Sequence, residues 1–162
     1  MSLIDIKNLT FSYETSFENI FEDVSFQIDT DWKLGFIGRN GRGKTTLLNL
    51  LLGKYDYRGK ISASVTFDYF PFEVEDKSRT TIDIIDSINN SYEVWELNRE
   101  LSLLDVDQDV LYRPFETLSN GEQTKVLIAA LFLNEGHFLL IDEPTNHLDA
   151  KARKSVAAYL KK

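Results

Sequence analysis

Apolar and polar residues alternate along much of the first seventy positions, which is the pattern of half-buried β-strands. Residues 3–13 alternate over their whole length and predict one edge strand or two short strands. Residues 24–28 alternate again and should pair with a neighbouring strand, and residues 60–69 hold two more strand-like pieces. The apolar run at residues 32–37 predicts a further strand. This part of the chain should therefore form a sheet.

The spacing of the apolar residues becomes helical in two places. Residues 46–52 predict a short helix, with Gly53 where a C-cap glycine belongs. Between residues 78 and 104 the apolar residues recur every three or four positions, with Ser78 or Thr80 as a suitable N-cap. This second segment predicts a small all-helical insert.

The α/β pattern returns after the insert. Ser119 or Asn120 should cap a helix that runs to about Asn134. Residues 138–141 form a continuous apolar run, which is typical of a strand buried on both faces of a parallel sheet. A last helix should begin near Ala150. Strands and helices in this order indicate an α/β protein.

Composition narrows the class of protein. The 162 residues suffice for one domain with a core, and the net charge of −8 argues mildly against a general nucleic-acid binder, although a local basic patch is compatible with it. There are no cysteines, which excludes disulfides and cysteine-based metal sites. The two histidines do not cluster with enough other ligands to suggest zinc.

The sequence contains no segment suited to cross a membrane or to direct export. The longest apolar stretches are about seven residues, whereas a membrane-spanning helix needs roughly 20. The start, Met-Ser-Leu-Ile-Asp, lacks the basic region and the long apolar region of a signal peptide. A cytoplasmic protein is the simplest interpretation, and a membrane partner on a separate chain is compatible with it.

The segment GRNGRGKTT contains the complete phosphate-binding loop G-x-x-x-x-G-K-[ST]. Gly38, Gly41 and Gly43 let the backbone curl so that several N–H groups point at one anion. Lys44 adds a positive charge for the β- and γ-phosphates, and Thr45 supplies a hydroxyl for Mg²⁺. A glycine-rich turn between a strand and a helix is the plain alternative. The predicted strand before the loop and the predicted helix after it favour ATP binding.

A second motif supplies acidic side chains. The apolar run at residues 138–141 is followed by Asp142 and Glu143, which is the arrangement of a Walker B strand. Ligands bind α/β sheets beyond the carboxyl ends of the strands, so Asp142 is suited to hold Mg²⁺, usually through a water. Glu143 suits a general base that orients the attacking water. An ordinary strand end has similar residues, and the phosphate loop earlier in the chain favours the functional interpretation.

Two further motifs resemble one family. LSNGEQ at residues 118–123 resembles the ABC signature, usually written LSGGQ, and DEPTNHLD at residues 142–149 resembles the segment from Walker B to the D-loop of ABC ATPases. The form with Thr-Asn-His before Leu-Asp is similar to the ABC-F subfamily, soluble proteins with two cassettes in one chain. The resemblance covers essentially the whole chain. It implies a P-loop NTPase core with a mostly parallel sheet flanked by helices, an N-terminal antiparallel β portion and a small helical subdomain.

The resemblance also implies a division of the chain and a partner. Residues 1–162 would be a single cassette, with residues 1–71 and 118–162 as the ATP-binding core and residues 72–117 as the helical subdomain. In ABC ATPases two cassettes sandwich two ATP molecules head to tail. A second cassette, in the same polypeptide or in a dimer, is therefore the first expected partner.

The residues implied for the site follow from the matching motifs. Ser119 and Gly121 would cap the γ-phosphate held by the other cassette, while Ser119 is also suited to cap its own helix. Tyr13 falls where the family places its adenine-stacking aromatic, and a plain strand residue is an equal alternative. The implied set is Glu143 for catalysis, Thr45 and Asp142 for Mg²⁺, and Tyr13, Gly38, Asn40, Gly41, Gly43, Lys44, Thr45, Thr46, Ser119, Gly121 and Asp149 for ATP.

The chain departs from the family pattern in three respects. Asn120 replaces the first signature glycine, and Glu122 gives the Glu-Gln form also found in ABC-F proteins. Phe72 occupies the place of the usual Q-loop glutamine. Neither His137 nor His147 matches the switch histidine. We therefore expect a C-terminally incomplete cassette, cut from the first cassette of a longer protein.

The resemblance implies an ABC-F-type ATPase whose conformational change acts on the ribosome, in translation or in antibiotic resistance by ribosome protection. One alternative is the ATP-binding subunit of a membrane transporter, which shares every nucleotide motif. The Thr-Asn-His-Leu-Asp segment and the missing Q-loop glutamine both argue against that alternative. A second alternative is a non-hydrolysing, ATP-gated interaction module, against which Glu143 argues.

Overall fold

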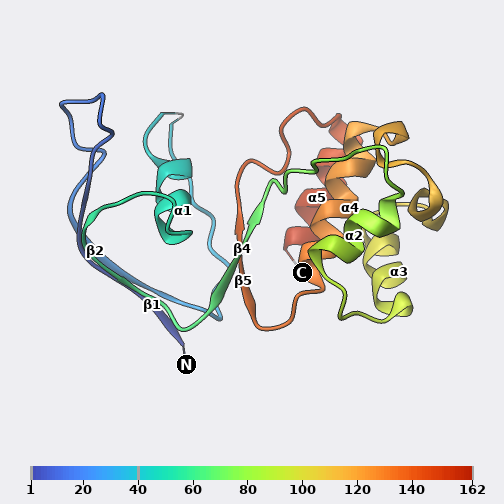
Figure 1. Ribbon diagram of the computed structural model, residues 1–162, viewed down its shortest axis with the longest axis horizontal. Coiled ribbons are helices and arrows are strands. Elements are labelled where there is room, and N and C mark those ends of the chain that lie inside the picture. Colours follow the sequence, from blue (N-terminus) through green and yellow to red (C-terminus); the bar gives the residue numbers. More distant parts are fainter. Residues whose placement is uncertain (1, 40, 162) are drawn as a thin grey trace. The chain divides into compact units, whose positions relative to one another are not determined.

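The structure, a computed structural model, describes residues 2–39 and 41–161. The chain divides into two compact units. The first unit comprises residues 1–67 and 136–140, and the second comprises the rest of the chain. Figure 1 labels most of the helices and strands of the two units.

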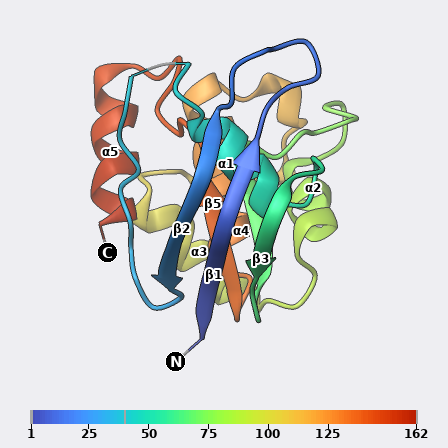
Figure 2. The ribbon, with the colours of Figure 1, turned by 90° about the vertical axis from the view of Figure 1, so that its left-hand side faces the viewer.

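The first unit contains a three-stranded antiparallel sheet (Figure 2). In it β1 (Leu3–Phe11) lies between β2 (Phe21–Asp29) and β3 (Arg58–Ser62). The apolar positions of β1 are buried: Ile4, Ile6, Leu9 and Phe11. The alternation thus predicted these strands correctly. It was wrong about the edge, because β3 returns alongside β1 and makes β1 the central strand.

Helix α1 (Lys44–Leu51) follows the phosphate loop, as the apolar spacing predicted. Its buried side chains include Leu47, Leu50 and Leu51. Gly53 has a φ of 70°, and its N–H donates to the carbonyl oxygen of Leu50 (3.0 Å). The expected C-cap glycine is confirmed by this left-handed turn.

The strand expected at residues 32–37 does not form in the structure, because residues 32–39 adopt neither helix nor strand. An apolar run makes a strand only where neighbouring strands pair with its N–H and C=O groups. The sheets in the described part of the chain join β1 to β2 and β3, and β4 (Thr66–Phe70) to β5 (His137–Ile141). The largest apolar side chains of the run are consequently more than half exposed: Trp32, Leu34, Phe36 and Ile37.

The strands β4 and β5 end side by side. The main-chain N–H of Asp142, directly after β5, donates to the carbonyl oxygen of Phe70 at the end of β4 (2.9 Å). Within β5 only Leu140 is fully buried, so this strand is not covered on both faces as its apolar sequence predicted. The pairing brings the Walker B residues next to the segment that follows β4.

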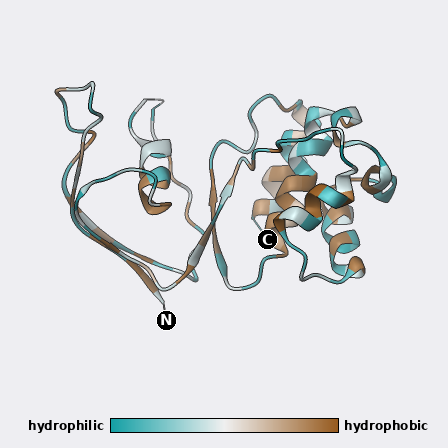
Figure 3. Ribbon diagram, viewed as in Figure 1, coloured by the Kyte–Doolittle hydropathy of each residue, from teal (hydrophilic) through white to brown (hydrophobic). Residues whose placement is uncertain are grey.

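The described residues of the second unit form four α-helices round an apolar core. They are α2 (Thr81–Ile88), α3 (Val94–Leu103), α4 (Asn120–Phe132) and α5 (Ala150–Leu160), with the 3₁₀ turns η1 (Gln108–Tyr112) and η2 (Phe115–Thr117) between α3 and α4. Figure 3 shows apolar residues along much of α4. The deeply buried side chains include Ile84, Ile85, Leu97, Leu101, Val126, Ile128 and Val156. None of the helices in the described part of the chain has the length and apolar character needed to span a membrane.

Candidate functional site

The phosphate loop leads directly into α1 in the first unit. Gly43 is the N-cap of the helix, and Lys44 is its first residue. The Lys44 ammonium donates to the loop carbonyl oxygens of Gly38 (2.7 Å) and Arg39 (3.1 Å). The positive side chain therefore lies over the loop, beside a helix N-terminus that itself favours negative charge. Asn40, another expected ATP contact, lies outside the described residues.

Gly43 is required by both backbone conformation and space. Its φ of 89° lies in the left-handed region that favours glycine. A Cβ at this position would lie 2.7 Å from Cγ2 of Ile20 and 3.1 Å from Cζ of Phe21. Gly41 also has a positive φ, of 77°, but no neighbouring atoms crowd it. The loop therefore uses its glycines in two different ways.

Tyr13 contacts the phosphate-loop helix in the first unit. Its hydroxyl shares a hydrogen bond of 2.7 Å with Oγ1 of Thr46, which is buried. The Tyr13 ring lies edge-on to Phe11 and to Tyr55, with centroid distances of 5.0 and 5.7 Å. This packing makes Tyr13 a structural residue, and its expected role in stacking on adenine stays a prediction.

Asp142 is held by a neutral donor in the second unit. The hydroxyl of Tyr69, near the end of β4, donates to Oδ2 of Asp142 (3.2 Å). Burial, followed by the negative charge of Asp142, raises the pKa of Tyr69 to about 12. The phenol therefore keeps its proton near neutral pH and remains a donor to the carboxylate.

Glu143 is held by a second neutral donor. The Asn146 side-chain amide donates to Oε2 of Glu143, and the Asn146 main-chain N–H donates to the Glu143 carbonyl oxygen (3.1 Å). Glu143 has a φ of 47°, which is uncommon for a residue with a Cβ. Strained backbone of this kind persists where its surroundings hold it, often at functional sites.

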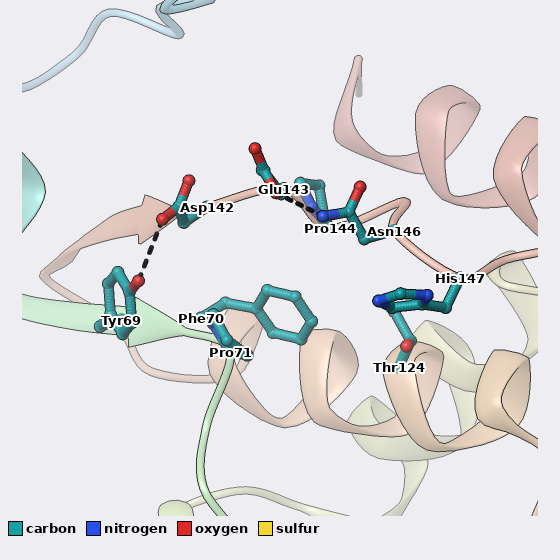
Figure 4. A pocket seen from close by; sticks show the side chains of 9 residues that line it. All are labelled: Tyr69, Phe70, Pro71, Thr124, Asp142, Glu143, Pro144, Asn146 and His147. Atoms are coloured by element: carbon teal, nitrogen blue, oxygen red, sulfur yellow. Dashed lines mark hydrogen bonds between the residues drawn. The ribbon is translucent and has the colours of Figure 1, made fainter. Parts of the chain in front are cut away.

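These residues line an open pocket of about 330 Å³ in the second unit (Figure 4). Its lining combines two carboxylates, a phenol, an amide, an imidazole and a threonine hydroxyl with the apolar side chains of one phenylalanine and two prolines. Its lining is Tyr69, Phe70, Pro71, Thr124, Asp142, Glu143, Pro144, Asn146 and His147. Such a mixture of acids and fixed donors beside an apolar surface is suited to proton transfer.

The signature segment caps α4 in the way one alternative anticipated. Oγ of Ser119 accepts the N–H of Glu122 (3.3 Å), and Oε2 of Glu122 accepts both the N–H and the hydroxyl of Ser119 (2.8 Å each). These reciprocal hydrogen bonds form a capping box. The hydrogen bond from the Ser119 backbone is the main cause that lowers the pKa of Glu122. The expected contact of Ser119 with a γ-phosphate stays a prediction.

Gly121 and Asp149 lie where α4 meets α5. A Cβ on Gly121 would lie 3.3 Å from Cβ of Ala152, so the glycine lets the two helices approach closely. Oδ1 of Asp149 accepts the N–H of Ala152 (2.7 Å) and caps α5. Both residues have structural roles, and their expected roles in ATP binding stay predictions.

A comparison with known protein families shows to which family the chain belongs. Residues 21–146 match the model of the family described as ABC transporter. The match spans more than half of the chain and includes the phosphate loop and the Walker B residues. The chain belongs to the ABC transporter family. This ABC cassette is thereby an ATP-binding domain.

Curated relatives of the cassette include both ABC-F proteins and a transport protein. It is 31% identical to ABC transporter F family member 4 of Dictyostelium discoideum, over 96% of the chain and 14% of the relative. It is 31% identical to the ribosome protection protein VmlR of Bacillus subtilis, over 97% of the chain and 29% of VmlR. The zinc import ATP-binding protein ZnuC of Ehrlichia chaffeensis is 32% identical, over 99% of the chain and 68% of ZnuC. The cassette spans between 14% and 27% of the length of the first four relatives.

Solved structures confirm the expected P-loop ATPase fold. A structure described as an inward-facing, metal-chelate type ABC transporter superposes with a TM-score of 0.79 at 27% identity, over 98% of this chain and 66% of that one. The α/β architecture with a helical portion is therefore the fold of the family.

The donor set of the cassette fits Mg²⁺. Among the residues that the structure describes, no three histidine, aspartate or glutamate side chains gather into a metal site. Mg²⁺ is usually bound through only one or two protein oxygens, together with waters and substrate phosphates. Asp142, directly after β5, and Thr45, in the first turn of α1, each carry such an oxygen, and their expected roles as Mg²⁺ ligands stay predictions.

Sequence reasoning missed the two donors in the pocket, Tyr69 and Asn146. In the sequence, Tyr69 was noted only because it begins the segment in which Phe72 replaces the Q-loop glutamine. In the structure, Tyr69 lines the pocket and Phe72 does not. Asn146 was used only to recognise a subfamily. For Tyr69 the missing information was the pairing of β4 with β5, because this pairing brings the end of β4 next to Asp142.

Proposed function

We propose that this cassette belongs to an ABC-F-type ATPase, which couples ATP binding and hydrolysis to a conformational change acting on the ribosome. The observation that carries the hydrolytic part is the pair of consecutive carboxylates after β5, each oriented by its own neutral donor. The ABC-F part rests on the Thr-Asn-His-Leu-Asp segment and on similarity to F family member 4. The name of VmlR supports the ribosome as partner and extends the proposal to ribosome protection against antibiotics.

The chain's own groups would divide the chemistry. The loop amides and Lys44 bind the phosphate oxygens, and the N-terminus of α1 adds favourable potential. Glu143 accepts a proton from the attacking water while the new P–O bond forms and the bond to the ADP oxygen breaks. Mg²⁺, when bound, would neutralise charge on the phosphates. A general base of this kind contributes about 10²–10⁴-fold to the rate.

A second cassette would complete the site. Ser119 and the N-terminus of α4 would face the γ-phosphate bound by the other cassette, and that cassette would return the same contact. The work of the cycle would then be the closing and reopening of the two cassettes. We place this protein in the cytoplasm, with ATP, a second cassette and the ribosome as its partners.

One other function has specific support. The chain covers 68% of ZnuC, whose name is that of a zinc import ATP-binding protein. The cassette would on that basis serve as the ATP-binding subunit of a membrane transporter. A non-hydrolysing, ATP-gated module is the remaining candidate, and the oriented Glu143 argues against it.

Ribosome sedimentation of the natural protein that carries this chain separates these functions. With ATP, a Glu143→Gln variant should bind and not hydrolyse, so it should accumulate on ribosomes and lose at least about 100-fold in steady-state ATPase rate. A Lys44→Ala variant should do neither, because it loses the phosphate contact. Capture of a membrane permease without ribosomes would favour the transporter subunit. Equal ATPase rates for the parent and Glu143→Gln would refute the catalytic assignment.

A further inference from the structure

The side-chain amide of Asn146, in the turn after β5, donates to the carboxylate of the proposed base, Glu143. The two residues are joined twice, because the Asn146 main chain also donates to the Glu143 carbonyl oxygen (3.1 Å). A side-chain bond and a main-chain bond together close a tight turn after β5. Asn146 therefore fixes both the backbone and the carboxylate of Glu143.

The backbone of Glu143 shows why such a contact is useful. A φ of 47° is rarely adopted by a residue with a Cβ and persists where other contacts hold it. The carboxylate on this residue would otherwise rotate freely, because the last torsion of a glutamate side chain is broad. An amide donor on Oε2 reduces that freedom and leaves Oε1 to accept a proton.

We propose that Asn146 is a positioning residue, whose amide holds the Glu143 carboxylate in the orientation that accepts the proton of the attacking water. The proposal rests on the proposed function, since it needs Glu143 to act as the base. Asn146 itself gains and loses no proton: the water proton passes to Glu143, and the Asn146 amide keeps its own hydrogens.

His147 is the other candidate for this role, because it lines the same pocket. Figure 4 shows the Asn146 amide turned toward Glu143, whereas the ring of His147 extends in the direction of Phe70, above Thr124. The contact with the carboxylate therefore comes from the amide. The adjacent imidazole shapes another side of the pocket.

The test compares two variants with a matched control in the natural protein. Asn146→Ala removes the side chain, and Asn146→Asp keeps its shape but replaces the donor by a second carboxylate facing Glu143. Asn134→Ala is the control, because Asn134 also donates its amide to a carboxylate, Oδ2 of Asp68 (2.6 Å), away from the pocket. For each variant we would measure kcat, KM for ATP and the melting temperature.

We expect both Asn146 variants to lower kcat by about tenfold or more while KM stays within about twofold, which is the signature of an interaction made in the transition state. Asn134→Ala should leave kcat within about twofold. The double variant Glu143→Gln/Asn146→Asp should have a higher melting temperature than Asn146→Asp alone. In the double variant, the amide at position 143 can donate to the carboxylate at position 146. This rescue reports the contact without reference to activity.

Three results would overturn the proposal, each for a different reason. Unchanged kcat in both Asn146 variants, with a large loss in Glu143→Gln, would leave the base in place and remove the positioning role. An equal loss in Asn134→Ala would show a general effect on folding. Unchanged kcat in Glu143→Gln would refute the proposed base itself, and the positioning role would fall with it.

Discussion

Gly43 combines two demands that no other residue type meets. Its left-handed φ turns the loop into α1, and the contact with Ile20 leaves no room for a side chain. Gly35, eight positions earlier, has no positive φ, and a Cβ added there would meet nothing within 4 Å. Substitutions at Gly35 and Gly43 can therefore be compared: glycine is required by the structure at Gly43 and is not required at Gly35.

We expect Gly43→Ala to lower the free energy of unfolding by about 1–3 kcal/mol, because a strained backbone conformation and a steric contact are added together. Affinity for a fluorescent ATP analogue should fall as well, since Lys44 follows directly. Gly35→Ala should change neither quantity measurably. Chemical denaturation and nucleotide titration give the two readouts, and equal effects of both substitutions would contradict the argument.

At the same scale, the sequence predicted the local setting of two motifs. The structure has Lys44 at the start of α1 and Asp142 and Glu143 directly after β5, as expected, and the chemical roles of these residues stay predictions. Tyr69 and Asn146 were not predicted, because several residue types can donate a hydrogen bond to a carboxylate. Their partners depend on which strands pair and on how a turn closes, and neither is encoded in a local pattern.

The contact between α3 and α5 shows how one polar pair joins two elements. The Tyr159 hydroxyl donates to Oε2 of Glu100 (2.5 Å), and both residues are buried. Arg99 neutralises the same carboxylate through Oε1 (2.8 Å). Burial, and then the hydrogen bond to Glu100, raises the pKa of Tyr159 well above its ordinary value. The neutral phenol is therefore the form that stabilises the fold.

This shift gives an alkaline pH dependence. The folded chain keeps the Tyr159 proton above about pH 10, where the phenol of the unfolded chain loses it, so the stabilisation is complete below about pH 10 and declines as the pH rises further. Tyr159→Phe should cost about 1–3 kcal/mol at about pH 8, because Glu100 loses a donor. Its stability should then fall less than the parent's between about pH 8 and about pH 10.5.

Denaturant unfolding at the two pH values measures the effect. Tyr112→Phe is the control, because the Tyr112 side chain is 74% exposed. An identical decline for parent and Tyr159→Phe would show that Tyr159 does not cause the pH dependence.

Elements were predictable where their ends carry their own signals. Thr80 accepts the N–H of Asp83 at the start of α2, and Ser119 does the same for Glu122 in α4. Each helix start was visible because a capping residue acts within one turn. The strand predicted at residues 32–37 is absent from the structure, and the sequence could not show this. A strand needs a partner strand for its hydrogen bonds, and the apolar run does not specify one.

At the scale of the whole chain, the residues expected to serve one nucleotide are divided between the two units. The phosphate loop belongs to the first unit, and Asp142 and Glu143 belong to the second. The division proposed from the sequence, with residues 72–117 as a helical subdomain, stays a prediction. A ligand that needs groups from both units links their stabilities by mass action.

Hydrogen exchange of the natural protein tests this link. ATP with Mg²⁺ should slow amide exchange both at residues 38–52 and at residues 141–149, because a bound ligand stabilises every segment it contacts. Exchange within α3 should change little. Lys44→Ala should abolish both effects together. Protection confined to one of the two segments would contradict a shared nucleotide.

The capping box at α4 has a consequence for the proposed contact between Ser119 and a γ-phosphate. The hydroxyl proton of Ser119 is committed to Glu122, so a γ-phosphate would have to draw that proton away from a nearby negative charge. A carboxylate so close to the signature serine weakens its grip on an anion. If Ser119 meets a γ-phosphate as proposed, Glu122 therefore competes with the phosphate for the serine hydroxyl proton.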